Sequence, residues 1–396
     1  MTYAVGQHLL RDRGRQINMH QILAGQNNEK ISETQFEIQM TSLLVQAQKA
    51  YWDLVFAGED LNVKQRSLDL AQRTLDENKM KVEIGTLAPI DVVQTQSDVA
   101  SRREQLVLST YNVTQSEDQI KKLTSSDKDP TMFLVKLRAQ ESPTRPDRVQ
   151  IPTLEDAIKV ALENRPEMRQ ASLDLENKEI DVEYTRNQKL PSFDVTATYN
   201  QNGTGGTQTV RGQGFLSTQI LSVVPGGIGK AFGQLFSYDY TGYSLGFSFV
   251  VPLSNKAQQA DYDRAVNEKR LSESRINVTA QAIALEVRNA LTQVEMNRAR
   301  IETAETTRQL AEQKLEAEQT KFNLGTSTLR FVLEEQRNVA QAQTNELESI
   351  VNFTKSLVDL DKAMGLTLSK NNIEIQKTLN PVAGITVVRK TETAAR

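Results

Sequence analysis

The residue types that most often carry chemistry are scarce in this chain of 396 residues. It has no cysteine, so disulfides, thiolate metal sites and cysteine nucleophiles are excluded. The two histidines, His8 and His20, lack metal-ligand spacing, and we interpret both as surface side chains. The glycine-rich run at 203–206 lacks the strand, lysine and helix context of a phosphate-binding loop. The sequence therefore predicts no catalytic set, no cofactor and no metal, and we expect no enzyme.

Charge and hydropathy exclude further classes of protein. The 47 basic and 50 acidic residues give a net charge of −3, which does not suggest a nucleic-acid partner. A mean hydropathy of −0.48 and the lack of a long apolar run argue against a transmembrane α-helix. Residues 1–6 have neither the basic start nor the apolar stretch of a signal peptide, which by itself favours a cytosolic protein.

Two stretches of the chain resemble each other at a constant offset of 240 residues. In each, a long helical pattern ends at a Gly-Thr pair and a second helical pattern follows. This arrangement predicts two internal structural repeats, each built on a long antiparallel helical hairpin that must pack against copies of itself. The matching positions are Leu70, Ala71, Leu75, Lys81, Gly85 and Thr86, which recur as Leu310, Ala311, Leu315, Lys321, Gly325 and Thr326.

The first repeat is expected to span residues 1–130. A row of large residues spaced by seven, beside a row of alanines, indicates a coiled-coil helix that continues for about 100 Å. Gly85 ends that helix and Pro89 begins the returning one. The expected elements are the end of a barrel strand near 3–10, a long helix over 14–84, a tip turn at 85–89 and a return helix over 89–125.

The second repeat, residues 153–366, is expected to contain the complete unit. A connector over 131–152 precedes it, packed on the outside of the helical rods, and a poorly ordered tail over 367–396 follows it. Within the repeat we expect helices over 154–189 interrupted at Asn164–Glu167, a strand at 192–201, a surface loop over 202–241, a strand at 242–251, a long helix over 254–324, a tip turn at 325–328 and a return helix over 329–365.

The two expected strands alternate strictly between apolar and polar residues. Their length, alternation and aromatic ends are typical of membrane barrel strands, with one face toward lipid and the other toward a polar lumen. The fold class is therefore mainly α with a small β part. The side chains expected to face lipid are Phe193, Val195, Tyr199, Tyr243, Leu245, Phe247 and Phe249.

Several motifs, in this order along the chain, resemble those of the TolC family of outer-membrane efflux proteins. Each motif alone is short, but together they extend over nearly the whole chain. They are Ala-Tyr-Trp-Asp-Leu at 50–54, Val-Glu-Ile-Gly-Thr-Leu-Ala-Pro-Ile-Asp-Val at 82–92, Asn-Arg-Pro-Glu at 164–167, Leu-Pro-Ser-Phe-Asp at 190–194, Phe-Ser-Phe-Val-Val-Pro-Leu at 247–253 and Phe-Asn-Leu-Gly-Thr-Ser at 322–327.

The resemblance implies a homotrimer in the outer membrane, with its helical part in the periplasm. Each protomer of the family gives four strands to a shared twelve-stranded barrel and several helices to a periplasmic α-barrel. Three copies can close a barrel that one cannot, and closure removes edges that lipid would not tolerate. The trimer is a passive conduit to the exterior, energised by an inner-membrane pump through a periplasmic adaptor, in efflux or type I secretion. The loop over 202–241 is then extracellular, and the connector equatorial.

The resemblance also implies a signal peptide, a first helix and a first strand before Met1. As written, the chain offers three strands per protomer, so we expect either a fragment or a misassigned start. A non-functional truncated channel is one alternative. A cytosolic coiled-coil scaffold is another, favoured by the lack of a signal peptide but not by the alternating strands. A periplasmic adaptor is a third, although it would carry a single hairpin.

The resemblance assigns roles to residues at the two turns. The adaptor's hairpins would dock at the tips, although the glycines there also serve to end helices with a positive φ. Asp91 and Glu334 match positions that constrict the tunnel entrance, while Phe331 stands where some members have aspartate. Asp91 could instead favour the N-terminus of its helix. The expected docking residues are Gly85, Thr86, Leu87, Gly325, Thr326 and Ser327.

Overall fold

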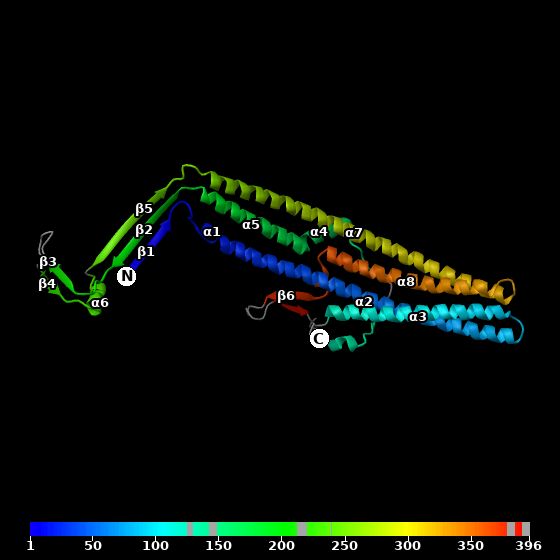
Figure 1. Ribbon diagram of the computed structural model, residues 1–396. Helices are drawn as coiled ribbons and strands as arrows, with labels where there is room; N and C mark the ends of the chain where they lie inside the picture. Colours follow the sequence, from blue (N-terminus) through cyan, green and yellow to red (C-terminus); the bar gives the residue numbers. More distant parts are fainter. Residues whose placement is uncertain (125–129, 142–148, 212–219, 239, 378–384, 390–396) are drawn as a thin grey trace, which may run out of the picture. The chain divides into compact units, whose positions relative to one another are not determined.

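The computed structural model describes residues 1–124, 130–141, 149–211, 220–238, 240–377 and 385–389. These residues are mainly helical with a small β part, as predicted, and Figure 1 traces their elements. The chain divides into two units, Met1–Ile31 with Ser172–Arg275, and Ser32–Ala171 with Ile276–Arg396. Over the described ranges, no helix is both long and apolar enough to cross a membrane.

The first unit contains an antiparallel sheet of three strands. These are β1 (Thr2–His8), β2 (Ser192–Gln201) and β5 (Thr241–Val250), in the order β1-β2-β5. Tyr199 lies opposite Tyr3 on one side and Tyr243 on the other, so the register forms a row of three tyrosines.

The two faces of this sheet differ in polarity. Residues directly opposite each other in an antiparallel pair point to the same face. Phe193 pairs with Phe249 and Val195 with Phe247, so apolar side chains gather on one face. The other face carries Asp194, Thr196, Thr198, Asn200, Ser244, Gly246 and Ser248.

The segment between β2 and β5 has more regular structure than the surface loop expected over 202–241. Strands β3 (Gln208–Arg211) and β4 (Ile220–Val224) pair as an antiparallel hairpin. A nine-residue helix, α6 (Ile228–Phe236), follows. The absence of this helix from the sequence prediction has a physical cause: it is short, and its two glycines, Gly229 and Gly233, disfavour a helix on propensity alone.

Helices extend from the sheet in the first unit. The helix expected over 14–84 is divided at Met19 into α1 (Arg15–Asn18) and α2 (His20–Glu83), which continues into the second unit. Helices α5 (Pro166–Gln188) and α7 (Lys256–Asn323) also begin or end here. Within this unit α5 contacts both neighbours: its Tyr184 ring stacks on His20 of α2, and its Lys178 pairs with Glu268 of α7 at 2.8 Å.

The second unit contains the two predicted helical hairpins. Helix α2 returns as α3 (Pro89–Thr124), and α7 returns as α8 (Leu329–Ala363). The larger apolar core joins α7 and α8 to the short helix α4 (Leu154–Asn164). Its fully buried members include Val287 and Val294. A smaller core between α2 and α3 is formed by Ala71, Leu75 and Val99, with Leu68 and Val92 against it.

Helix α4 begins and ends where the sequence indicates. Thr153 is its N-cap, and the Thr153 hydroxyl accepts a hydrogen bond from the Asp156 amide at 3.3 Å. At the far end, Arg165 separates α4 from α5. Its buried guanidinium binds Glu167 and Glu286 at 2.9 Å each and donates to the carbonyl of Lys362, so this break also connects α4, α7 and α8.

Within the predicted tail, residues 367–377 and 385–389 have regular secondary structure. They form α9 (Thr367–Lys370) and an antiparallel pair of strands, β6 (Ile373–Lys377) and β7 (Ile385–Arg389). The reason is a short period-two alternation of isoleucine and valine, which suits paired strands. In the connector, only a 3₁₀ helix at Pro130–Leu134 is regular among the described residues. Parts of the predicted connector and tail, 142–148, 378–384 and 390–396, lie outside the described residues.

Candidate functional site

The turn between α2 and α3 is built by backbone hydrogen bonds around Gly85. The Gly85 amide donates to the Val82 carbonyl at 3.0 Å, and the Thr86 amide donates to the Lys81 carbonyl at 2.9 Å. This pair of bonds is the Schellman arrangement, which requires a positive φ after the helix. Gly85 supplies it with a φ of 77°, and open space surrounds the position where a side chain would lie.

The turn between α7 and α8 repeats this geometry at the offset of 240 residues. The Gly325 amide donates to Phe322 at 3.0 Å, the Thr326 amide donates to Lys321 at 2.9 Å, and Gly325 has a φ of 76°. Both threonine hydroxyls donate to the same lysine carbonyls as their own amides. The sequence repeat is therefore a repeat of backbone structure.

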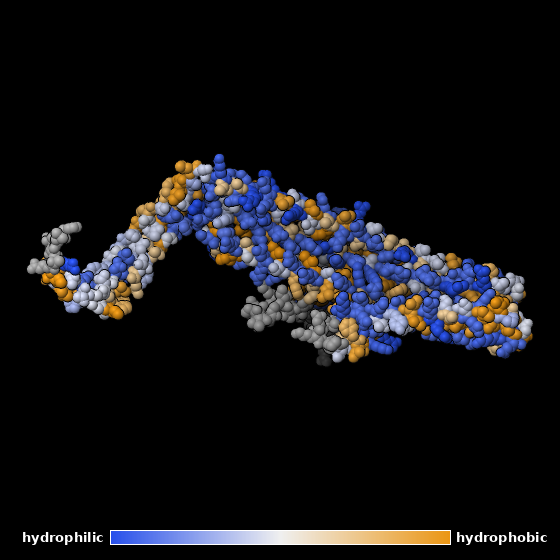
Figure 2. All heavy atoms as spheres, in the orientation of Figure 1, coloured by the Kyte–Doolittle hydropathy of each residue, from blue (hydrophilic) through white to orange (hydrophobic). Residues whose placement is uncertain are grey.

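The two turns expose backbone and apolar side chains together. Gly85, Thr86 and their counterparts in the second turn are exposed, whereas Leu87 and Ser327 are half-buried. Ile84 and Leu324, one residue before each glycine, are 73% and 74% exposed. Figure 2 shows apolar side chains at this end of the hairpins. A cation–π contact of 5.3 Å from Lys81 Nζ to the Phe322 ring connects the two turns.

The three expected gate residues differ in exposure. Asp91 is half-buried in the first turn of α3, Phe331 is 51% exposed and Glu334 is exposed. Across the part of the chain that the structure describes, no hydrogen bond or ion pair joins these three. The Asp91 carbonyl accepts a hydrogen bond from Thr95, whose hydroxyl also accepts one from Asn78 at 3.1 Å in the buried seam between α2 and α3.

A buried ion pair that the sequence did not predict lies two turns further along α3. The Arg102 side chain is 3% exposed and the Asp98 side chain 6% exposed, and Arg102 Nε donates to Asp98 Oδ2 at 2.6 Å. The same guanidinium donates to the Ser67 hydroxyl of α2 and to Gln336 Oε1 of α8. Arg337 of α8 approaches Asp98 at 3.8 Å from the other side.

This cluster joins both hairpins through one buried cation. Its only sequence signal is the spacing of four between Asp98 and Arg102, which places both on one helix face. A buried charge stays only where its hydrogen-bonding groups have partners. The Arg102 cluster, defined as Asp98, Arg102, Ser67, Gln336 and Arg337, therefore holds α2, α3 and α8 together near the turns.

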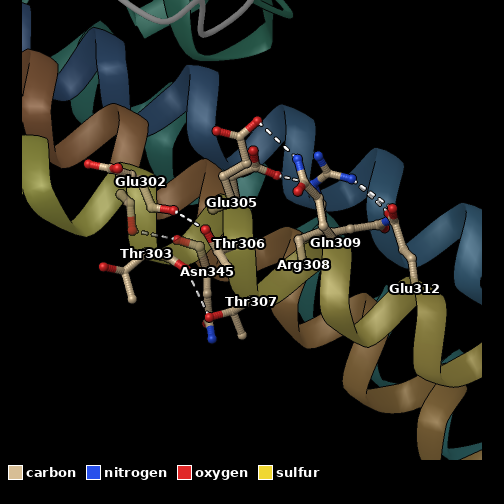
Figure 3. A network of polar contacts seen from close by, with 12 residues as sticks. Glu302, Thr303, Glu305, Thr306, Thr307, Arg308, Gln309, Glu312 and Asn345 are labelled. Carbon is tan, nitrogen blue, oxygen red and sulfur yellow. Dashed lines mark hydrogen bonds and ion pairs between the residues drawn. The ribbon is translucent and has the colours of Figure 1, made fainter.

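A second arginine lies on the apolar seam of α7. Arg308 interrupts that seam in the sequence, and in the structure it pairs with Glu312 at 2.8 Å and with Glu346 of α8 at 2.5 Å. The Glu312 carboxylate, and secondarily Glu346, raise the pKa of Arg308 above its usual value against the lowering effect of burial. Figure 3 shows this stretch of α7, where threonine hydroxyls such as that of Thr306 donate to backbone carbonyls one turn earlier.

Polar contacts also join the two hairpins further from the turns. Asp60 of α2 accepts hydrogen bonds from Thr344 of α8 at 2.9 Å and from Ser109 of α3 at 3.1 Å. Lys49 pairs with Asp359 of α8 at 2.6 Å. Polar contacts of α2 with α8 therefore join the two hairpins here.

The seven side chains predicted to face lipid lie on the same face of the sheet. The pairs Phe193–Phe249 and Tyr199–Tyr243 bring aromatic rings to 5.9 Å and 5.1 Å between centroids. Tyr243, Leu245, Phe247 and Phe249 are each more than 60% exposed. An exposed apolar face this broad indicates a contact surface, because water solvates such a face poorly.

The two histidines make local contacts with neighbouring side chains. His8 lies 2.6 Å from Asp194 on the polar face of the sheet, and His20 stacks on Tyr184. Among the residues with a described placement, no three histidine, aspartate or glutamate side chains are grouped closely enough to hold a metal ion.

Comparison with known proteins gives a consistent result. A family model described as Outer membrane efflux protein matches residues 14–126 and 157–366. Outer membrane protein TolC of Vibrio cholerae is 20% identical over 361 residues, which are 91% of this chain and 74% of that protein. The CmeC outer membrane channel of Campylobacter jejuni superposes with a TM-score of 0.67 at 18% identity, over 93% of this chain and 77% of that one. The outer membrane protein VceC of Vibrio cholerae gives a TM-score of 0.67 at 14% identity, over 92% and 86%.

Proposed function

Since this chain belongs to the outer membrane efflux protein family and is an outer-membrane channel with a periplasmic helical part, we propose that it is the exit duct of a tripartite efflux or type I secretion system. Channels of the TolC family are trimers that work with adaptors and pumps. In this proposal three copies form a passive conduit from the periplasm to the exterior. An inner-membrane pump supplies the energy through a periplasmic adaptor. The chain itself carries out no chemistry.

The observation that carries the proposal is the pair of matched turns. Two backbone structures with the same hydrogen bonds, each rimmed by an exposed apolar residue, present the same surface twice in every protomer. A partner with a repeated hairpin can bind such surfaces in the same way at each turn. We assign adaptor docking to Gly85, Thr86, Leu87, Gly325, Thr326 and Ser327.

Cross-linking tests this assignment directly, because the chain has no cysteine of its own. Thr86→Cys and Thr326→Cys, each labelled with a benzophenone maleimide in cells and irradiated, should capture one and the same periplasmic adaptor, identified by mass spectrometry. Leu285→Cys, on an exposed site in the middle of α7, is the matched control and should capture no adaptor. Capture of cytosolic proteins alone would instead support the scaffold alternative.

A second step of the same experiment tests the turn geometry. Gly325→Pro, which cannot adopt a φ of 76°, should reduce adaptor capture by Thr326→Cys at least tenfold while trimer formation persists. Gly325→Asn tolerates the left-handed conformation and should retain capture. Equal capture by the proline and asparagine variants would remove the turn from the docking surface.

A barrel can form when several copies of the chain pair their sheets edge to edge. Strands β1 and β5 are the edges of the described sheet, and lipid does not tolerate unpaired strand edges. We propose that copies of the chain close the sheet, with the seven predicted residues on the outer, lipid-facing side. The polar face around Thr196 and Ser248 then lines the lumen.

The proposed gate consists of residues that lie just beyond the turns of the two hairpins. We propose that Asp91, Phe331 and Glu334 narrow the periplasmic entrance, and that opening requires the hairpins to splay. Splaying would separate α3 from α8, which the Arg102 cluster joins. Opening would therefore require Arg102 to exchange its Gln336 contact for water or for another partner.

A further inference from the structure

Helix α6, in the segment between β2 and β5, carries an apolar stripe that nothing in the described chain covers. Ile228, Phe232 and Phe236 are spaced by four and therefore lie along one side of the helix. They are 78%, 58% and 68% exposed. We call these three residues the α6 stripe. Large apolar side chains grouped on one exposed side of a helix indicate a contact surface.

A second side of α6, around Ala231 and Gln234, is seated on the end of β2. An added side chain at Gly203 would lie 2.1 Å from the Ala231 carbonyl oxygen, so the helix backbone rests directly on this glycine. The Thr204 amide donates to Gln234 Oε1 at 3.0 Å. The glycine-rich run that is no phosphate loop thus serves as the seat of α6. The exposed α6 stripe lies outside this seat.

The strand register indicates on which side of the sheet the seat lies. The ladder between β2 and β5 continues one residue further, since the Asn202 amide donates to the Tyr240 carbonyl at 3.1 Å. Side chains alternate along such a ladder, so the Gly203 position falls on the same face as Tyr199. That is the apolar face with Phe247. Helix α6 therefore sits at the end of the strands, on the side proposed to face lipid.

The composition around α6 also favours an apolar surrounding. Residues 201–242 contain only three charged residues, Arg211, Lys230 and Asp239. The neighbouring strand β4 exposes Ile220, Leu221 and Val223. Figure 2 shows apolar atoms gathered over α6 and over the β3–β4 hairpin. The rings of Tyr199 and Tyr243 lie 5.1 Å apart, tilted against each other, near the strand ends, and tyrosines are typical of the interface between a membrane and water.

We propose that α6 is an interfacial helix, whose stripe lies among the lipids of the outer leaflet of the outer membrane, against the outside of the barrel rim. The inference rests on the proposed function, because it uses the lipid-facing side of the sheet. Lys230, on the side of the helix away from the stripe, is free to reach anionic headgroups. The helix would then fix the depth of the barrel in the bilayer, since its seat on Gly203 transmits that position to β2.

Nitroxide labels can measure the surroundings of the helix in the trimer. Phe232→Cys places a label in the stripe, Lys230→Cys on the opposite side of the same helix, and Phe247→Cys on the barrel face. Each trimer is reconstituted in vesicles containing lipopolysaccharide, and relaxation by oxygen, which concentrates in lipid, is compared with relaxation by a water-soluble nickel chelate. We expect the oxygen-to-nickel ratio at positions 232 and 247 to exceed that at 230 at least threefold.

The outcomes separate this inference from the function on which it rests. A lipid-type ratio at 247 with a water-type ratio at 232 overturns the interfacial helix and leaves the barrel in place. A water-type ratio at 247 overturns the lipid-facing sheet itself. Strong spin–spin broadening at 232 means that copies of the chain cover the stripe, and low accessibility to both reagents means that another protein segment does. Either result also overturns the proposal.

Discussion

At the scale of single residues, the Arg102 cluster contains an ion pair whose two side chains are both buried. Removing one partner of a buried ion pair costs about 3–5 kcal/mol, because the other charge stays buried without compensation. Replacing both partners by apolar residues of similar volume costs much less. The Arg102 guanidinium also satisfies Ser67 and Gln336, so its loss would leave polar groups of α2 and α8 without a donor.

Substitutions at Arg102 and Asp98 should therefore be strongly non-additive. Arg102→Met is expected to lower the free energy of unfolding by about 3 kcal/mol, while Arg102→Met with Asp98→Leu lowers it by about 1 kcal/mol. Urea unfolding of the detergent-solubilised trimer, followed by helix signal, measures both. Arg264→Met is the matched control: it breaks an exposed pair with Asp261 and should change stability by less than about 0.5 kcal/mol. Additive losses would contradict the buried pair.

At the scale of elements, local sequence patterns predict the turns and strands whose defining residues lie close together along the chain. The Gly-Thr pairs predict both turns because a Schellman turn is completed within six residues. Alternation predicts β2 and β5, since period two is a property of each strand alone. The Arg102 cluster could not be predicted, because Ser67 and Gln336 are 35 and 234 residues from Arg102. Helix α6 was missed because it is short and glycine-containing, and its contact with Gly203 is a tertiary feature that local patterns do not contain.

The sheet permits a test of its two faces with one pair of substitutions. Phe247→Arg places a charge on the face proposed to contact lipid and should cost about 2–4 kcal/mol per protomer near the bilayer centre, so trimer yield should fall severalfold. Ser248→Arg, one residue later, points to the polar face opposite Asp194, where the charge has a partner, and should leave the yield nearly unchanged. Trimer yield after membrane extraction is read on unheated gels. Normal yield from Phe247→Arg would refute the lipid-facing assignment.

At the scale of the whole molecule, the two hairpins have the same backbone geometry at their turns but differ in charge near them. The buried pair Asn78 and Thr95 in the first hairpin corresponds, at the offset of 240, to Glu318 and Glu335 in the second. Hydrogen bonds from Ser327 and then Lys321 lower the pKa of Glu318, and those from Asn338 and then Lys314 lower the pKa of Glu335. Both carboxylates therefore remain charged at neutral pH, so the second hairpin carries two negative charges where the first carries a neutral pair.

The entrance should respond to neutralisation of the two expected gate carboxylates. In the proposed gate of a trimer, Asp91 and Glu334 would contribute six negative charges that hold cations and repel anions. Asp91→Asn with Glu334→Gln should therefore raise single-channel conductance in planar bilayers about twofold and reduce the preference for cations. Glu302→Gln, an exposed glutamate elsewhere on α7, removes a charge away from the turn and should change neither quantity. Unchanged conductance and unchanged selectivity in the double variant would exclude both residues from the gate, and the constriction would then have to be sought at Phe331 and the Arg102 cluster.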